Sequence, residues 1–461
     1  MKADRMNTRV MLGGAAVLVA AGLTAAAVAR RGPALAEPSV LAAAGASNPT
    51  AAAGPRGERF VAWIATEGGA SNVYLARAEG AAFGRGVRVN DRPGDAAPHE
   101  QAPAQVAVGP DGAIYVVWQN NREIPGRRFP ASDLRLARST DGGRTWAPAV
   151  TVNDDADGAP SSHTFHNLLV ARDGTVWVSW LDSRVRDAER ARRHPRAAPA
   201  AHDMNEQAMH AMPEAAGASM PAMPAQPAGD SVKAMHGHGG MAEDPTLPGS
   251  EVRVAKSTDG GKTFGPSVVV DGGVCPCCRT SLAAGADGSV FVAWRKVFAG
   301  DVRDVVVAKL APGAAAFGAP VRVHADGWVF PGCPHAGPSL AVDGQGRLHV
   351  AWYTGKEGRQ GLWHAVSADG GRTFGEAAAL LTGGWVPPSQ VALAADGDRV
   401  WATWDDRRVV EGPVTFARID GDRVSVVARE RAGRSPALAS GSDGVLVAWH
   451  QGQTVRVSAL R

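Results

Sequence analysis

One pattern recurs along most of the chain and restricts the fold more than any other feature. It consists of a strand of small residues, a turn that usually contains Asp-Gly, and an apolar strand that ends in tryptophan, as in P-D-G-A-I-Y-V-V-W and A-D-G-S-V-F-V-A-W. Seven copies end at Trp63, Trp118, Trp180, Trp294, Trp352, Trp404 and Trp449. Most of these tryptophans follow one another at intervals of 45 to 62 residues, the range expected for four-stranded blades. The pattern predicts an all-β protein, a β-propeller with seven four-stranded blades.

The two ends of the repeat region indicate how the ring closes. The last copy, from residue 435 onward, has room for three strands only. The segment from Pro38 to Ala43 is expected to supply the missing fourth strand. Closure of this kind leaves no open sheet edge, which stabilises a ring of blades.

Three turns between strands share a second pattern. Residues 139–146 read S-T-D-G-G-R-T-W, residues 257–264 read S-T-D-G-G-K-T-F, and residues 367–374 read S-A-D-G-G-R-T-F. In such turns Asp and Ser or Thr side chains bond nearby backbone groups, and Gly takes a positive φ. The turns resemble the Asp box, or BNR repeat, of the sialidase-like β-propellers. The resemblance implies one such propeller over residues 37–461, with six blades as the alternative to seven, and a structural role for the turns at the blade periphery.

The first 36 residues have the layout of an export signal. Basic residues precede an apolar run over residues 11–29, and Ala34-Leu35-Ala36 offers a small-x-small cleavage pattern. We expect a periplasmic or extracellular protein, with an uncleaved inner-membrane anchor through residues 11–29 as the alternative. Five of the 48 basic and one of the 45 acidic residues lie in this segment, which leaves 43 and 44 for the rest. This balance gives no indication of nucleic-acid binding.

The long interval between Trp180 and Trp294 contains an insertion, residues 182–250, rich in Ala, Pro, Met and His. It has no alternating strand pattern and no sustained helical stripe, so we expect a flexible loop. Its candidate metal ligands are Met204, Met209, His210, Met212, Met235, His236, His238 and Met241. Thioethers select Cu(I), and imidazole accepts Cu(II) and Zn(II). The insertion is therefore predicted to collect copper, with an inert linker as the alternative.

All four cysteines lie in two connections between adjacent blades. Cys275, Cys277 and Cys278 occupy one connection, and Cys333 and His335 occupy the equivalent position one blade later. Ring geometry is expected to bring these loops together on one face. His163 and His166 enter the propeller from the same side. One hypothesis is a metal site built from these cysteines and histidines; the other is one or two disulfides, such as Cys333 with Cys277 or Cys278, and the two are compatible.

The resemblance to sialidases also implies a set of catalytic candidates. That family uses an arginine cluster for the substrate carboxylate, a tyrosine nucleophile polarised by a glutamate, and an aspartate acid/base. The corresponding candidates here are Arg279, Arg295, Arg303, Tyr353 and Glu357. The family's R-I-P motif is missing, however, and Tyr353 directly follows a repeat tryptophan, where it is equally suited to packing.

Three functional hypotheses follow. The first is an exported propeller that binds copper or another soft metal through the Cys/His site and the Met/His-rich loop, in copper handling. The second is an enzyme, either an exo-α-sialidase-like glycoside hydrolase or a metal-dependent oxidoreductase. The third is a scaffold without catalysis that binds another exported protein. Fold resemblance alone does not decide between them.

Overall fold

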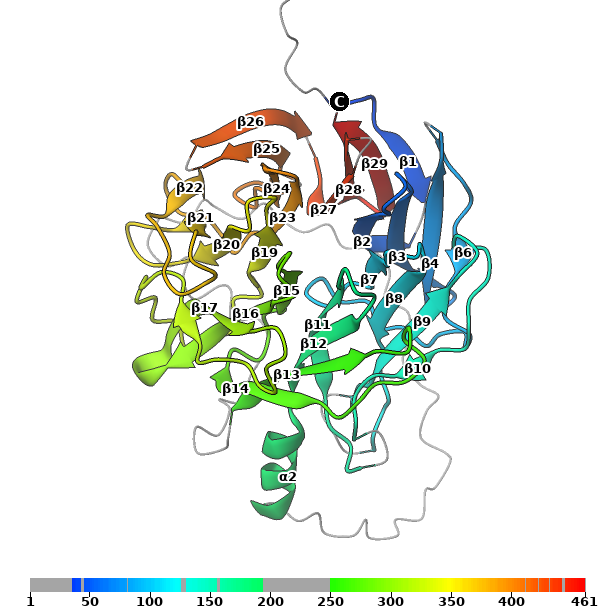
Figure 1. The fold of residues 1–461 in the computed structure, drawn as a ribbon, viewed down its shortest axis with the longest axis horizontal. Coiled ribbons are helices and arrows are strands. Elements are labelled where there is room, and N and C mark those ends of the chain that lie inside the picture. The colour runs from blue at the N-terminus through cyan, green and yellow to red at the C-terminus, as the bar shows by residue number, and fades with distance from the viewer. Residues whose placement is uncertain are drawn as a thin grey trace, which may run out of the picture.

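The computed structural model describes residues 35–42, 45–80, 82–125, 130–155, 158–193, 249–410, 412–421, 423–430, 432–441 and 444–460. This part of the chain is almost entirely antiparallel β-sheet, arranged around a centre (Figure 1). The exceptions are helix α2 (Arg184–Arg193) and the short 3-10 helix η2 (Ala299–Asp301). None of the described helices is long and apolar enough to span a membrane. The apolar run at residues 11–29 lies outside the described residues.

The first half of the chain forms three sets of strands. The first contains β2 (Ala46–Ala53), β3 (Arg59–Glu67), β4 (Ala70–Glu79), β5 (Ala82–Phe83) and β6 (Val87–Arg88). The second contains β7 (Gln105–Val108), β8 (Ile114–Gln119), β9 (Leu134–Ser139) and β10 (Val150–Thr151). The third contains β11 (His163–Val170), β12 (Val176–Asp182), β13 (Ser250–Ser257) and β14 (Val268–Val274).

The second half repeats the arrangement. The sets are β15 (Ser281–Ala284), β16 (Val290–Phe298), β17 (Val302–Leu310) and β18 (Val321–Arg322); then β19 (Ser339–Val342), β20 (Leu348–Thr354), β21 (Gly361–Ser367) and β22 (Ala378–Leu381). They are followed by β23 (Val391–Asp396), β24 (Arg399–Asp405), β25 (Val414–Asp420) and β26 (Arg423–Glu430). The last set is β27 (Arg434–Gly441), β28 (Gly444–Gln451) and β29 (Thr454–Leu460), joined by β1 (Ser39–Ala42).

The repeat tryptophans occupy the second strand of each set, as the pattern predicts. They lie on β3, β8, β12, β16, β20, β24 and β28, and none is more than 4% exposed. Each indole packs with small and branched residues of the neighbouring strands, so the tryptophans form the core between adjacent sets. Burial of such large side chains is a major contribution to the stability of the propeller.

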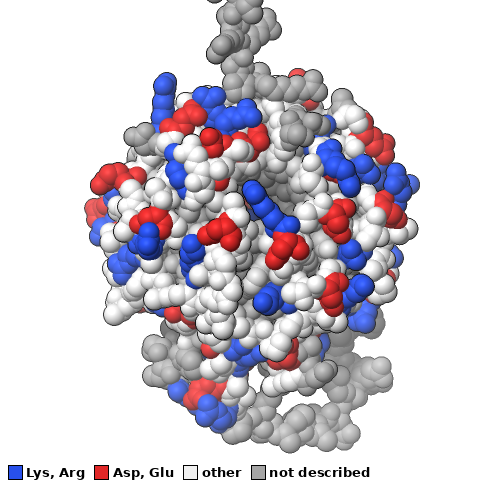
Figure 2. All heavy atoms as spheres, in the orientation of Figure 1, with Lys and Arg blue, Asp and Glu red and all other residues white. Residues whose placement is uncertain are grey.

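The inner strands surround the centre of the molecule in chain order. β2 contacts β7, and contacts continue through β11, β15, β19, β23 and β27 back to β2 (Figure 1). The surface is hollowed near this centre, where basic and acidic side chains lie next to one another (Figure 2). Two of the sets are joined in one eight-stranded sheet through a single residue pair, Val274 with Lys296. The all-β propeller is thus confirmed, while the number of blades stays a prediction.

The N-terminal segment closes the last sheet, as predicted. β1 pairs with β29 in antiparallel register, Ser39 opposite Val457. The pairing extends to Leu35, which is bridged to Leu460 and lies before the predicted cleavage point. The two ends of the described chain therefore share one sheet, which protects the edge of β29.

The three Asp-containing turns have the predicted local chemistry. In the turn after β13, Ser257 Oγ donates to Asp259 Oδ1 at 2.7 Å, and Thr263 Oγ1 donates to Asp259 Oδ2 at 2.6 Å. Gly260 and Gly261 have positive φ angles of 75° and 77°. These hydrogen bonds hold the pKa of the Asp259 carboxyl well below its usual range, although the group is exposed.

The beginning of the insertion differs from the expectation. Residues 184–193 form helix α2, in which Glu189 pairs with Arg192 and Arg193. The helix has no buried residue, and it is stabilised by ion pairs and by the Asp182 carboxylate, which accepts from Arg184 N at its first turn. The helix was not predicted because its sequence lacks the apolar stripe of an amphipathic helix. All the methionines and histidines of the insertion named above lie outside the described residues.

Candidate functional site

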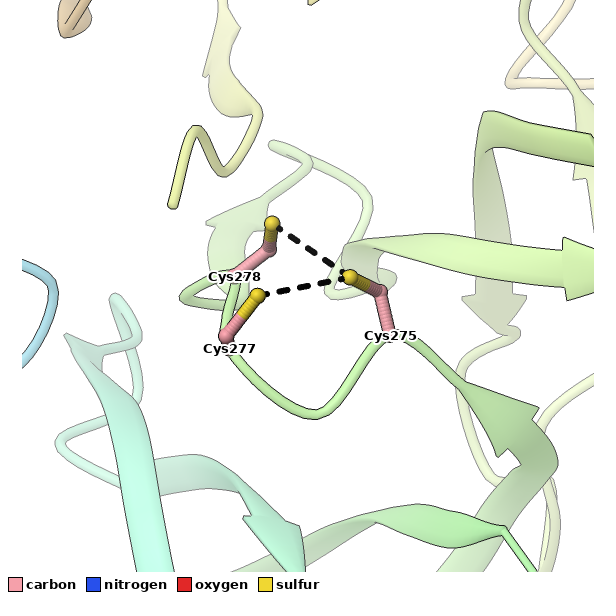
Figure 3. Close-up of side chains that lie close together, drawn as sticks. All are labelled: Cys275, Cys277 and Cys278. Carbon is pink, nitrogen blue, oxygen red and sulfur yellow. Dashed lines mark hydrogen bonds between the residues drawn. The ribbon is translucent and has the colours of Figure 1, made fainter. Parts of the chain in front are cut away.

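Three of the four cysteine side chains converge in the connection between β14 and β15. Cys275 Sγ lies 3.6 Å from Cys277 Sγ and 3.7 Å from Cys278 Sγ (Figure 3). The three sulfur atoms all lie within 4.8 Å of one another, and the residues are buried against Phe165 and Val297. The loop is held at its start by the Cys275 amide, which donates to the carbonyl of Arg295 at 2.9 Å. A short loop thus presents three thiols to one point.

The fourth cysteine reaches the same cluster from the next connection. Cys333 is exposed, and a contact with its thiol is one of the causes that raise the pKa of Cys277. The predicted disulfides are not found: none of the four cysteines forms a disulfide bond. The sulfur separations within the cluster are well above the roughly 2.05 Å of a disulfide bond, because the loop directs the three side chains toward a common centre rather than pairing two of them.

The protonation of the three thiols is uneven. Hydrogen bonds from Cys277 and Cys278 and the charges of Arg303 and Arg295 hold the pKa of Cys275 well below its usual range, despite burial. Arg303 Nη1 donates to Cys275 Sγ at 3.1 Å. Burial raises the pKa of the Cys277 and Cys278 thiols. These shifts favour the thiolate form at Cys275 and the thiol form at Cys277 and Cys278, which bind a metal ion by releasing their protons.

The spacing of the cluster suits a shared ion. Sulfur ligands on one tetrahedral ion, with metal–sulfur bonds of about 2.3 Å, lie about 3.8 Å apart. The two measured separations from Cys275, 3.6 and 3.7 Å, are close to this value. Thiolates are ligands of Cu(I), Zn(II) and iron–sulfur clusters. The donor set thus fits a soft metal ion with little rearrangement.

The histidines predicted as ligands are placed elsewhere. His163 Nε2 lies 2.9 Å from Asp155 Oδ1 and 3.6 Å from Asp182 Oδ2, in a network that Arg184 also enters. Burial would lower the pKa of His163, but the hydrogen bond with Asp155 and the two carboxylate charges raise it. Asp155, His163 and Asp182 are close enough to hold an ion, but the Arg184 guanidinium already pairs with both carboxylates.

The other two histidines also lie outside the thiol cluster. His166 is fully buried. Burial lowers its pKa to about 4, against a smaller opposing effect of the Val117 and Pro103 backbone. The His335 ring stacks at a tilt against that of His99, with centroids 6.0 Å apart. Neither histidine belongs to the group of close metal-ligand atoms formed by the three cysteines.

Two of the sialidase candidates belong to the surroundings of the thiols. Arg303 connects Cys275 to the carbonyl of Phe330. Arg295 is 1% exposed and donates to the carbonyls of Arg303, Ala336 and Tyr353 at 2.9, 3.0 and 2.7 Å. Sequence reasoning assigned both to an anionic substrate; the structure places them beside the cysteines.

The tyrosine and glutamate candidates do not form a nucleophile pair around the ring centre. Tyr353 is buried, its hydroxyl donates to the carbonyl of Val386 at 2.8 Å, and burial raises its pKa to about 12. Glu357 is exposed in the turn after β20. Neither residue lines the central cavity.

The central cavity has a volume of about 210 Å³ and is lined by the inner strands and the connections that enter them. Of the catalytic candidates, Arg279 alone lines it, and its Nη2 donates to the carbonyl of Val391 at 3.2 Å. Burial lowers the pKa of Arg279, which the charges of Glu100 and Asp405 counteract. Arg279 directly follows Cys278, so one loop serves both the thiol cluster and the cavity.

Glu100 is a cavity residue that sequence reasoning missed. It forms an ion pair with Arg407, 307 positions away in the sequence, and accepts from Ser435 Oγ at 2.7 Å. These partners outweigh burial and lower its pKa. Gln390, also in the cavity wall, has a buried side-chain oxygen without a partner. No local motif marks either residue, because their partners come from distant blades.

Comparisons with known proteins support the fold. No protein-family model matches the chain, and no curated protein matches it. An ulvan lyase, a polysaccharide lyase bound to -[GlcA(1-4)Rha3S]-, is similar with a TM-score of 0.53 at 12% identity, over 91% of this chain and 95% of that chain. A Hadza microbial sialidase gives 0.49 at 14% identity, over 85% and 73%. An α-L-arabinanase from Penicillium chrysogenum gives 0.47 at 12% identity, over 93% and 98%.

Of these three neighbours, the ulvan lyase has a TM-score above 0.5, and its likeness supports the β-propeller fold. At such low identity the likeness shows the fold alone. The function has to be argued from the thiol cluster and the cavity.

Proposed function

We propose that this protein is an exported sialidase-like β-propeller that binds a soft metal ion, in the first place copper, through Cys275, Cys277 and Cys278. One observation carries the proposal: three buried sulfur atoms converge at the spacing of ligands on a shared ion. Cys333, whose thiol acts on Cys277, is a candidate fourth ligand for an ion of higher charge. A buried, thiolate-rich site favours Cu(I) over hard cations such as Mg²⁺ or Ca²⁺.

The Met/His-rich segment is proposed as a second donor set that collects copper for the thiol site. The described chain supports this by the place where the insertion ends. Ser250, at the start of β13, lies directly opposite Val274, the residue before Cys275. The insertion therefore ends beside the thiol loop, where the chain enters β13.

Competitive titration with Cu(I) under anaerobic conditions tests the proposal. Full-length reduced protein is titrated against a chromophoric Cu(I) chelator while free thiols are counted. We expect one tightly bound ion that protects the three loop thiols, and loss of this ion in the variant with Cys275, Cys277 and Cys278 all changed to Ser. Removal of residues 202–241 serves as the matched control, because it should reduce total copper but leave the thiol-protecting ion in place. Equal binding by the triple variant and the wild type would overturn the proposal.

A second candidate function is supported by the central cavity. Its wall combines the Arg279 guanidinium with the Glu100 carboxylate and several amide and hydroxyl groups, and a neighbour of the same fold is a polysaccharide lyase. The candidate is a glycan-acting enzyme, such as an exo-α-sialidase-like glycoside hydrolase. No tyrosine is among the described residues that line the cavity, so the nucleophile of a sialidase has no counterpart there. Release of fluorophore from a 4-methylumbelliferyl sialoside, abolished in Arg279→Gln, would establish this function; absence of turnover on sialosides and uronic-acid polysaccharides would exclude it.

A further inference from the structure

Two buried arginines stand beside the thiol cluster without a carboxylate to balance them. Arg295 forms no described ion pair and gives its hydrogen bonds to three backbone carbonyls. Arg303 lies 3.9 Å from one Asp301 oxygen, but that carboxylate is 53% exposed. Buried cations are costly unless an anion lies close to them. The group next to these guanidiniums that becomes anionic when it binds a metal ion is the sulfur cluster, and Arg303 Nη1 donates to Cys275 Sγ at 3.1 Å.

The charges of this buried unit restrict the metal ion that completes it. Three thiolates carry three negative charges, and Arg295 and Arg303 supply two positive charges. A monovalent ion brings the unit to zero, whereas a divalent ion leaves one positive charge in a buried place. With a fourth thiolate from Cys333, a divalent ion brings the net charge of the unit to zero, and a monovalent ion leaves one negative charge. Cys333 is exposed and belongs to a different connection, so it is the weakest member of the donor set.

We infer that Arg295 and Arg303 determine the charge selectivity of the site, so that Cys275, Cys277 and Cys278 bind a monovalent soft cation without Cys333. This rests on the proposed function, because it assumes that the three thiols bind one ion. It adds a specificity that the thiols alone do not provide, since thiolates accept both Cu(I) and Zn(II). The selecting residues are the two arginines of the β16–β17 hairpin, which are not ligands.

The test compares Ag(I) with Cd(II), two redox-stable soft ions that differ in charge. Their affinities are measured by chelator competition on full-length reduced protein, with free thiols counted in parallel. Arg303→Met removes one charge near the ion and keeps the side-chain volume. One unit charge about 5 Å away at an effective dielectric constant of about 20 changes the ratio of Ag(I) to Cd(II) affinity on the order of 100-fold. We therefore expect the ratio to fall by about that factor in Arg303→Met.

Two matched variants separate charge from shape and from global effects. Arg303→Lys keeps the charge and should keep the ratio within a few fold. Arg322→Met removes a cation on β18 of the same sheet, which pairs with Asp304 at 3.3 Å instead of with the thiols, and should also leave the ratio unchanged. Cys333→Ser provides a test that does not disturb the buried arginines. It should leave Ag(I) affinity within a few fold and lower Cd(II) affinity by tenfold or more.

The outcomes distinguish failure of the charge selectivity from failure of the metal site itself. If both ions protect the thiols but Arg303→Met leaves their affinity ratio unchanged, the charge selectivity is wrong and the metal site remains. An equal loss of both ions in Cys333→Ser would overturn the three-thiolate arrangement in the same way, even if Arg303→Met failed to fold. If neither ion protects the thiols of the wild-type protein, the proposed function itself is wrong.

Discussion

Replacement of His166 by Gln should remove part of the acid sensitivity of the folded protein. The imidazole is fully buried, and burial lowers its pKa to about 4. In the unfolded chain the same group titrates near its ordinary value of about 6.5. Below pH 6.5 this imidazole is protonated in the unfolded state but stays neutral in the folded state. Its contribution to the free energy of unfolding is therefore complete above pH 6.5 and decreases as the pH falls toward 4.

The size of the effect follows from the two pKa values. One pKa unit corresponds to 1.36 kcal/mol, so lowering the pH from 8 to 5 costs about 2 kcal/mol through this one group. Urea unfolding at pH 8, 6.5 and 5, followed by the fluorescence of the buried repeat tryptophans, measures it. The stability of the wild type and of His166→Gln is each compared with its own value at pH 8. This is needed because other buried histidines, such as His364 with a pKa lowered to about 3, add to the loss of stability in both proteins.

The wild type should lose about 2 kcal/mol more stability between pH 8 and 5 than His166→Gln does. Equal losses of stability in the two proteins would refute the prediction, since they would mean that the folded state does not lower the pKa of His166. The same variant should bind the thiol-site metal with unchanged stoichiometry. Loss of that ion would restore His166 as a ligand, in conflict with its place outside the cysteine cluster.

Three further predictions concern the scaffold and the cavity. Asp259→Ala removes the acceptor of the turn hydrogen bonds from Ser257 and Thr263. It should destabilise the protein by only about 1 kcal/mol in urea unfolding, because the turn is exposed. An unchanged unfolding midpoint would show that the carboxylate does not hold the turn. Deletion of residues 1–42 removes β1 and uncovers the edge of β29, so light scattering should detect concentration-dependent association that the full chain lacks; a monomeric, equally stable product would contradict the closing role. Glu100→Gln removes one of the two carboxylates that pair with Arg407, which keeps Asp405 at 3.0 Å, and should lower stability by about 1 kcal/mol. A melting temperature equal to that of the wild type would show that the Glu100 pair contributes nothing.

Much of the fold was accessible from the sequence because its signals are local. The tryptophan repeat and the Asp-Gly turns depend on residues within one hairpin. The closing strand was predicted because the last copy of the repeat is one strand short. The convergence of the two cysteine loops was also predicted, since ring geometry places equivalent connections of adjacent blades together. Helix α2 was not predicted, because it is stabilised by ion pairs and has no apolar stripe.

The surroundings of the site needed the tertiary structure. Residue types alone suggested disulfides, histidine ligands and an arginine cluster for a sugar acid. The structure instead shows cysteines without disulfide bonds, His163 in a carboxylate network and two arginines beside Cys275. The β16–β17 hairpin brings Arg295 and Arg303 to the loop that follows β14, and Glu100 meets Arg407 from the other end of the chain.

The sequence by itself determined the propeller, the order of its strands and the loops that carry sulfur. Only the tertiary structure decided which side chains face one another within those loops. The physical reason is that strand and turn patterns depend on neighbours a few residues away, whereas the charge and geometry of a buried site depend on contacts between distant segments whose packing is set by the whole ring.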